Sequence, residues 1–165
     1  MIAQTLEPPY RTAPNPGCDR ATLAMATLTR CRTSILPHLA SAAIASVRID
    51  YDGGGDEGQA HEVEAFGIDG KPVTVPMIGC ERHQLNHDGS VTVDIVDLTD
   101  ALTSLAESAL EALYDGWENG EGAFGAVVID VASQSVTLEH NTRFVSYDTA
   151  HHVLQVRCRT ATITR

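Results

Sequence analysis

The stretch that decides the fold is Gly116-Trp117-Glu118-Asn119-Gly120-Glu121-Gly122-Ala123-Phe124-Gly125, which holds the single tryptophan of the chain. It follows the clearest helical pattern in the sequence and precedes the clearest strand–turn–strand pattern. Its four glycines allow the backbone to turn sharply and to approach other groups closely. We therefore interpret it as a junction between a helix and a strand.

A second glycine-rich stretch, Tyr51-Asp52-Gly53-Gly54-Gly55-Asp56-Glu57-Gly58, lies between two segments with strand periodicity. Val47, Ile49 and Tyr51 alternate with polar residues before it, and residues 59–66 can return beside them. This pattern predicts a β-hairpin with a flexible turn that is longer than minimal. The two glycine-rich loops are the predicted functional surface.

Two helices are predicted on either side of this hairpin. Asp97 or Thr99 is the expected N-cap of the later helix, which ends near Gly116. Its apolar face is Leu98, Leu102, Leu105, Ala109 and Leu113. The earlier helix is expected from an N-cap at Asp19 to about Ala45, with a kink or break at Pro37.

The remaining segments predict strands. Alternation favours strands at 91–95, 124–131 and 136–141, a short edge strand within 71–77, and one or two more strands at 143–147 and 152–159. Residues 67–89 otherwise have no regular pattern. The predicted class is α+β, a mainly antiparallel sheet with two helices packed on one face, in the order α-β-β-β-α-β-β-β.

The length of 165 residues and an apolar content of 43% fit one globular domain. We expect an irregular N-terminal tail at 1–17, which contains four prolines, and a single α+β domain at 18–165. No apolar run approaches the length of a membrane span, and the N-terminus lacks a signal pattern. The four cysteines are widely spaced. These features favour a cytoplasmic protein with free thiols.

The net charge of −11 is concentrated in the middle of the chain. Residues 49–148 hold twenty acidic residues against Lys71, Arg82 and Arg143, and both glycine-rich loops lie in this region. Direct binding to nucleic-acid phosphates or to an anionic membrane is therefore disfavoured. A basic protein surface, a cation, or a solvated acidic face remain open.

Several groups of residues suggest specific chemistry. The acids around Asp52, Asp56 and Glu57 offer oxygen ligands for calcium, although their spacing does not match a helix–loop–helix calcium loop. Cys80, His83 and His87 have a spacing compatible with three zinc ligands, or with a cysteine–histidine pair. His140 has Asp130 or Glu139 as a candidate acid–base partner. Zinc and calcium are thus possible ligands, and no organic cofactor is expected.

An aromatic cluster is expected beneath the junction. Trp117, Phe124, Phe144 and Tyr147 are its candidate members, and its simplest role is to anchor the helix to the sheet. An exposed Trp117 ringed by Glu118 and Glu121 would instead indicate a protein-binding surface.

The two loops also resemble an uncharacterised bacterial family, a domain of unknown function. The resemblance rests on the Y-D-G-x-G-D-x-G loop, on the G-W-E-N-x-x-G-x-F-G junction, and on Leu138, Glu139, His140 and Asn141, and it covers roughly residues 20–150. No activity is implied by this resemblance. It indicates which positions form the surface.

The sequence contains no nucleophile elbow, phosphate-binding loop or dinucleotide fingerprint. We therefore expect a non-enzymatic protein-interaction or regulatory module, with an inhibitor that imitates nucleic-acid charge as one specific version. The alternative is a metal-dependent or cysteine-based enzyme that uses Cys80, His83 and His87 or the acidic loops. The oligomeric state is open. The expected binding surface consists of Tyr51, Asp52, Asp56, Glu57, Trp117, Glu118, Asn119, Glu121, His140 and Asn141.

Overall fold

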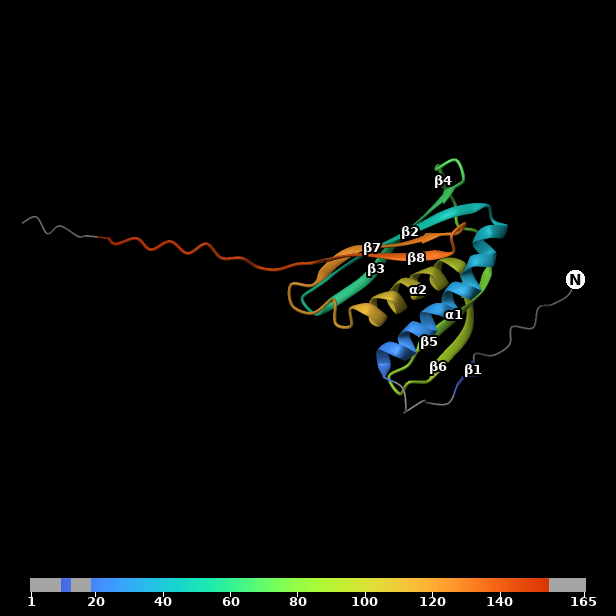
Figure 1. Cartoon of the computed structure of the whole chain (residues 1–165), viewed down its shortest axis with the longest axis horizontal. Helices are drawn as coiled ribbons and strands as arrows, with labels where there is room; N and C mark the ends of the chain where they lie inside the picture. The colour runs from blue at the N-terminus through green and yellow to red at the C-terminus, as the bar shows by residue number, and fades with distance from the viewer. Residues whose placement is uncertain (1–9, 13–18, 155–165) are drawn as a thin grey trace, which may run out of the picture.

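The computed structural model describes residues 10–12 and 19–154. Two helices, α1 (Arg20–Ser41) and α2 (Leu98–Leu113), pack against each other and lie on one side of two antiparallel sheets (Figure 1). The fold is α+β, as predicted, and the order of helices and strands roughly follows the expected one. No helix among the described residues is long and apolar enough to cross a membrane.

Each helix begins at the aspartate that the sequence indicates. Asp19 accepts a hydrogen bond from the backbone N–H of Thr22 at 3.0 Å, and Asp97 accepts one from Thr99 at 3.0 Å. The Thr22 bonds hold the pKa of Asp19 below its ordinary value. α1 continues through Pro37 and ends at Ser41, four residues before the predicted end.

The larger sheet has five strands in the order β4-β3-β2-β7-β8. Its central strand β2 (Ile44–Gly54) pairs with β3 (Glu57–Gly67) and β7 (Ala123–Asp130). The outer strands are β4 (Pro72–Val73) and β8 (Ser135–Thr142). β2 buries Val47, Ile49 and Tyr51, the alternation that predicted it.

The smaller sheet has the order β1-β6-β5 and was not expected as a separate unit. It consists of β1 (Tyr10–Arg11), β6 (Val91–Asp97) and β5 (Gly79–Leu85). Its β5 lies in the segment for which no regular structure was predicted, because a polar residue, His83, takes one of its buried positions. Residues 10–11 also correct the expected irregular tail, since they pair with β6.

One hydrophobic core joins the two helices to both sheets. It includes Leu39 of α1, Val47 of β2, Cys80 of β5, Leu102 of α2 and Val127 of β7. Each is buried, so the helix pair is fixed against the sheets by side chains from all layers.

Two local predictions are wrong. The hairpin turn is minimal rather than long, because Gly54 pairs directly with Glu57 and only two residues intervene. Residues 143–147 form no strand, and residues 152–154 form none either; the rest of the strand expected at 152–159 lies outside the described residues.

Candidate functional site

The two glycine-rich loops bind each other at one end of the larger sheet. The backbone N–H of Gly55 donates to the Gly120 carbonyl at 2.8 Å, and that of Asp56 donates to the Glu118 carbonyl at 3.1 Å. The Asp56 carboxylate accepts a bond from the Gly120 N–H at 3.2 Å. Asp56 therefore holds the loops together rather than standing free for a partner.

The hairpin turn explains why this contact is possible. Gly55 and Asp56 have φ angles of 65° and 66°, as in the mirror-image turns that suit the twist of a two-residue hairpin. Their N–H groups point out of the ladder toward the loop that joins α2 to β7. The turn is thus an anchor for that loop.

Trp117 packs directly on the hairpin backbone. A Cβ atom placed on Gly53 or on Gly58 would lie 2.5 Å from its ring. The ring meets Tyr51 edge-on, with 5.2 Å between centroids. These glycines are therefore required because the indole occupies the space where their side chains would be.

His140 is fixed on β8 by two tyrosines. Tyr114 stacks on its ring at 3.7 Å between centroids, with an interplanar angle of 7°. The Tyr51 hydroxyl lies 2.7 Å from His140 Nδ1 and donates to the Glu139 carbonyl at 2.9 Å. Because the hydroxyl has one proton, Nδ1–H must be the donor to the tyrosine oxygen, and Nε2 carries the lone pair.

Burial sets the protonation of this group. It raises the pKa of Tyr51 to about 12 and lowers the pKa of His140 below its ordinary value. At neutral pH the pair is thus an uncharged imidazole on an uncharged phenol. Gly125 makes the approach possible, since a Cβ there would lie 2.8 Å from the Tyr51 hydroxyl and 2.0 Å from the Glu139 carbonyl oxygen.

Arg143 is a site residue that the sequence did not indicate. Its guanidinium lies 2.8 Å from the Asp52 carboxylate, donates to the Gly53 carbonyl at 2.9 Å, and covers the Phe124 ring at 4.7 Å. Arg143 follows β8, so it connects the end of that strand to the hairpin. Asp52 therefore has an intramolecular partner.

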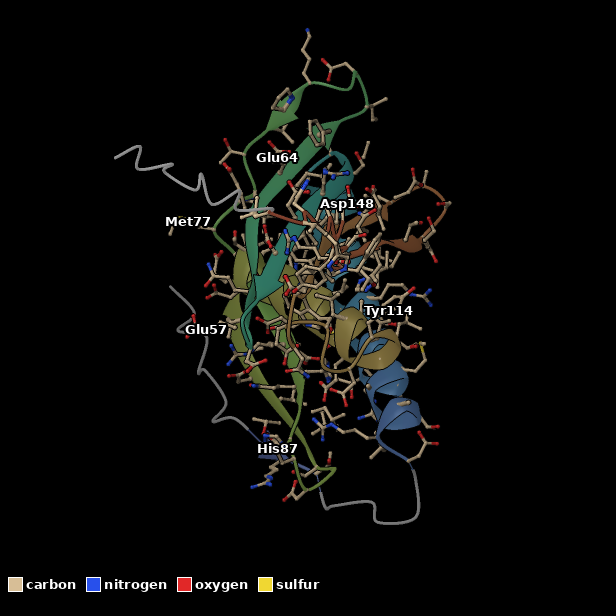
Figure 2. The ribbon with its side chains drawn as sticks, turned by 90° about the vertical axis from the view of Figure 1, so that its left-hand side faces the viewer. Glu57, Glu64, Met77, His87, Tyr114 and Asp148 are labelled. Carbon is tan, nitrogen blue, oxygen red and sulfur yellow. The ribbon has the colours of Figure 1, made fainter. Side chains whose placement is uncertain are left out.

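Two hollows flank the loop that joins α2 to β7. The first, of about 470 Å³, we call the aromatic hollow; the second, of about 480 Å³, we call the acidic groove. Figure 2 shows Tyr114 and Glu57, which line one hollow each, on opposite sides of this loop. The aromatic hollow is lined by Tyr114, Trp117, Asn119, Glu121, His140, Thr142, Arg143, Phe144 and Val145, among others.

Six carboxylates line the acidic groove: Asp56, Glu57, Glu107, Glu111, Asp115 and Glu118. Gln59, Trp117 and two glycines complete the lining, and no lysine or arginine belongs to it among the described residues. Glu111 is paired with Arg20 of α1 at its far side. The groove thus concentrates negative charge beside an aromatic ring.

All ten residues of the expected binding surface lie at this end of the molecule, but Tyr51 is only 2% exposed and so lies beneath the surface rather than in it. Asn141 donates to the Phe124 carbonyl at 3.2 Å, and Asn119 and Glu121 belong to the aromatic hollow. The expected aromatic cluster is wrong, because Phe144 and Tyr147 are 84% and 86% exposed. Trp117 packs with Tyr51 instead.

Cys80, His83 and His87 lie elsewhere and do not come together. His83 is buried against α1, with Nε2 3.3 Å from Ser34 Oγ, while His87 is exposed in the turn after β5, well away from Glu57 and Tyr114 (Figure 2). Within the described residues, no group of three His, Cys, Asp or Glu side chains has the arrangement of a metal site. The zinc prediction assumed that Cys80, His83 and His87 lie on one loop. Cys80 and His83 instead lie on strand β5, whose extended backbone keeps them apart from His87.

The thiols in this region are packed rather than reactive. Burial raises the pKa of Cys80 to about 11 and also raises that of Cys31. Both thiols donate to carbonyls across the α1–β5 contact, Cys31 to His83 at 3.3 Å and Cys80 to Ser34 at 3.8 Å. A thiol with such a pKa is a weak nucleophile at neutral pH.

Comparison with known proteins places the chain in a family without assigning it an activity. Neither the curated proteins nor the solved structures gave a match. A family model does match residues 27–154, which include most of α1, all of α2, both glycine-rich loops and His140. The chain therefore belongs to the family of unknown function DUF6878.

Proposed function

We propose that this chain is a non-enzymatic protein-interaction module that holds a basic segment of another protein in the acidic groove. The observation that carries the proposal is the set of six acidic residues around one hollow of about 480 Å³, of which Asp56 accepts from the Gly120 N–H and Glu111 pairs with Arg20. Each lysine or arginine placed there gains about 1 kcal/mol of Coulomb energy per carboxylate at 4 Å, even at the dielectric constant of water. Several such contacts add to a specific preference for cations.

Trp117 supports the same partner. An arginine or lysine over the face of an indole is attracted by about 0.5–1 kcal/mol at an exposed site. The ring is held rigidly by Gly53 and Gly58, so a partner side chain would not have to order it first. A cytoplasmic protein or nucleoprotein with an exposed basic segment fits this chemistry, and an inhibitor that replaces nucleic acid on such a partner is its most specific form.

The structure also decides which acids to change in a test. Asp52 and Asp56 hold the loops together, so replacing them would disturb the surface as well as its charge. Glu57 and Glu118 also line the groove, and no side-chain hydrogen bond or ion pair ties them to the rest of the loops among the described contacts, so they are the better positions. The matched control is Glu62 and Glu64, two exposed acids farther along β3.

The experiment compares what co-purifies with tagged wild-type chain, with E57K/E118K, and with E62K/E64K, at low and high salt. A stoichiometric partner should bind the wild type and the control alike, and should be lost at high salt and from the groove variant, with affinity reduced about tenfold or more. Titration of the same partner against Trp117 fluorescence then measures that affinity. Equal binding to the groove variant and to the control would refute the proposal.

The alternative, an enzyme, has one observation in its favour. His140 is a neutral imidazole whose Nε2 lone pair is fixed by the Tyr51 contact, beside a hollow of about 470 Å³. A small molecule that shifts the His140 ring resonances equally in wild type and in E57K/E118K would favour this function over the first. Binding that depends on Glu57 and Glu118 would favour the module.

A further inference from the structure

The two edges of the larger sheet are built differently. One edge is β4, which has two residues and begins with a proline, as in edges that are protected from further pairing. The other edge is β8, which has eight residues in unbroken register with β7 and contains neither proline nor lysine. A long, regular edge of this kind offers a full row of backbone groups to another strand.

β8 leads, through the anchored Arg143, into an extended arm, residues 144–154. The arm continues in the direction of the strand and leaves the body of the molecule (Figure 1). Every residue from Phe144 to Leu154 is exposed, and the side chains of Phe144, Tyr147, Val153 and Leu154 are 84–88% exposed. Apolar side chains gathered in this way on one segment indicate that it packs on something.

The family model runs to residue 154 and so includes the whole arm. The arm therefore lies within the part of the chain that the family model matches. An extended segment of eleven residues reaches roughly 35 Å, which is enough to cross the face of a second domain.

A hollow at the opposite end of β8 matches the arm. It has a volume of about 320 Å³ and lies between α1 and the β7–β8 turn. Its lining is mostly apolar, and Arg32 is its single charged residue: the full lining is Arg32, Thr33, Leu36, Pro37, Ala40, Val131 and Gln134. The arm in turn contains one acidic residue, Asp148, which Figure 2 labels where the arm points toward the viewer.

A twofold axis brings these features together. If two β8 strands pair antiparallel along their full length, Thr142 of one copy lies opposite Ser135 of the other. The arm that follows Arg143 then runs past the partner's β7–β8 turn and reaches its hollow beside α1. In an extended chain Phe144 falls on the same face as Leu138 and His140, the face that carries the helices.

We propose that two copies of this chain form a symmetric dimer, in which the β8 edges pair and each arm packs into the hollow between α1 and the β7–β8 turn of the other copy. The occupant is a second copy because one pairing fills both the edge and the hollow, and because Asp148 complements Arg32. The larger sheet then becomes continuous across the dimer, with β4 at both outer ends. This inference is independent of the acidic groove.

The first experiment measures mass in solution by sedimentation equilibrium. The full chain should have twice its monomer mass of 17.6 kDa, and a chain ending at Arg143 should be monomeric. F144S/Y147S should raise the dissociation constant at least tenfold. I68S removes a side chain that is 90% exposed in the β3–β4 turn and should leave it unchanged, so it controls for the loss of any exposed hydrophobic group.

A second experiment tests the geometry. Full-length pairing places Thr142 of one copy opposite Ser135 of the other, within disulfide range. In a background where Cys18 and Cys158 are serine, T142C and a tagged S135C should form a mixed disulfide when combined under mild oxidation. A monomeric full chain, a dimer that persists without the arm, or an arm that binds only an unrelated protein would each overturn the proposal.

Discussion

Two regions of this molecule contain histidine next to potentially reactive groups, and they differ in what surrounds them. His83 lies between α1 and β5 among buried thiols and serine hydroxyls, in the core of the fold. His140 lies among tyrosines at the end of the larger sheet, where two hollows open to solvent. The comparison shows that residue type and spacing alone do not identify a site, because burial decides whether the same side chain packs or meets a ligand.

The loop end depends on close backbone approach, and this can be tested at Gly122. Its φ is 72°, and a Cβ there would lie 1.9 Å from the Gly53 carbonyl oxygen. G122A should therefore lower the free energy of unfolding by about 3 kcal/mol or more. The alanine would be strained at this positive φ, and the Gly53 backbone would also have to move away from its Cβ. Urea denaturation measures the change.

Gly120 is the matched control for this substitution. It has a similar φ of 62° but open space around the position of a Cβ. G120A should cost only about 1 kcal/mol, the strain of the left-handed conformation. Equal costs for the two variants would show that the loops do not touch as described.

The Tyr51–His140 pair can be broken without creating a large cavity. Y51F removes one hydroxyl and leaves the Glu139 carbonyl and His140 Nδ1 without that partner. We expect a loss of about 1–2 kcal/mol in unfolding free energy and a mixture of imidazole tautomers in place of one. Nitrogen chemical shifts of the His140 ring report the tautomer, and an unchanged ring spectrum in Y51F would contradict the assignment.

The buried His83 should make the free energy of unfolding depend on pH, with a smaller effect than the substitutions above. Burial lowers the pKa of His83 below its ordinary value near 6.5, and Nδ1 is buried with no hydrogen-bond partner among the described atoms. The folded state therefore resists protonation: stability is full above pH 6.5 and falls as the pH drops toward the lower folded pKa. The slope cannot exceed about 1.4 kcal/mol per pH unit for one group.

Denaturation midpoints at pH 7.5 and 5.5 test this expectation. H83Q should lose much of the dependence, whereas H87Q, which changes an exposed histidine, should keep it. Glu81 lies 3.5 Å from His83 Nε2 and partly favours the charged ring, so E81Q should steepen the fall. A wild-type midpoint that does not change between these pH values would contradict the assignment of His83 as a buried histidine that resists protonation.

The sequence predicted what depends on local periodicity. The apolar steps of α2, the alternation of β2 and the aspartate caps of both helices are local signals, and each matched the structure. The ten residues expected to form a binding surface gather at one end, because the loops and strand ends that carry them meet at the same end of the sheet. The resemblance to a family of unknown function is also confirmed.

What the sequence could not predict depends on contacts between distant segments. Strand β5 was not predicted, because the polar residue His83 occupies a buried position and so breaks the hydrophobic alternation. The role of Arg143 follows from its contacts with Asp52 and Gly53, about ninety positions away. The second sheet likewise exists through the pairing of β1 and β5 with β6, which no local pattern specifies.

The two buried thiols report how often the contact between α1 and β5 opens. Cys31 lies on α1 and Cys80 on β5, and each is 1% exposed, so an alkylating reagent can reach them only when the helix separates from the strand. Burial raises the pKa of both thiols in the closed state, so they become ordinary nucleophiles only once the contact has opened. In a chain where Cys18 and Cys158 are serine, the rate of thiol modification thus measures how often α1 separates from β5, without denaturant.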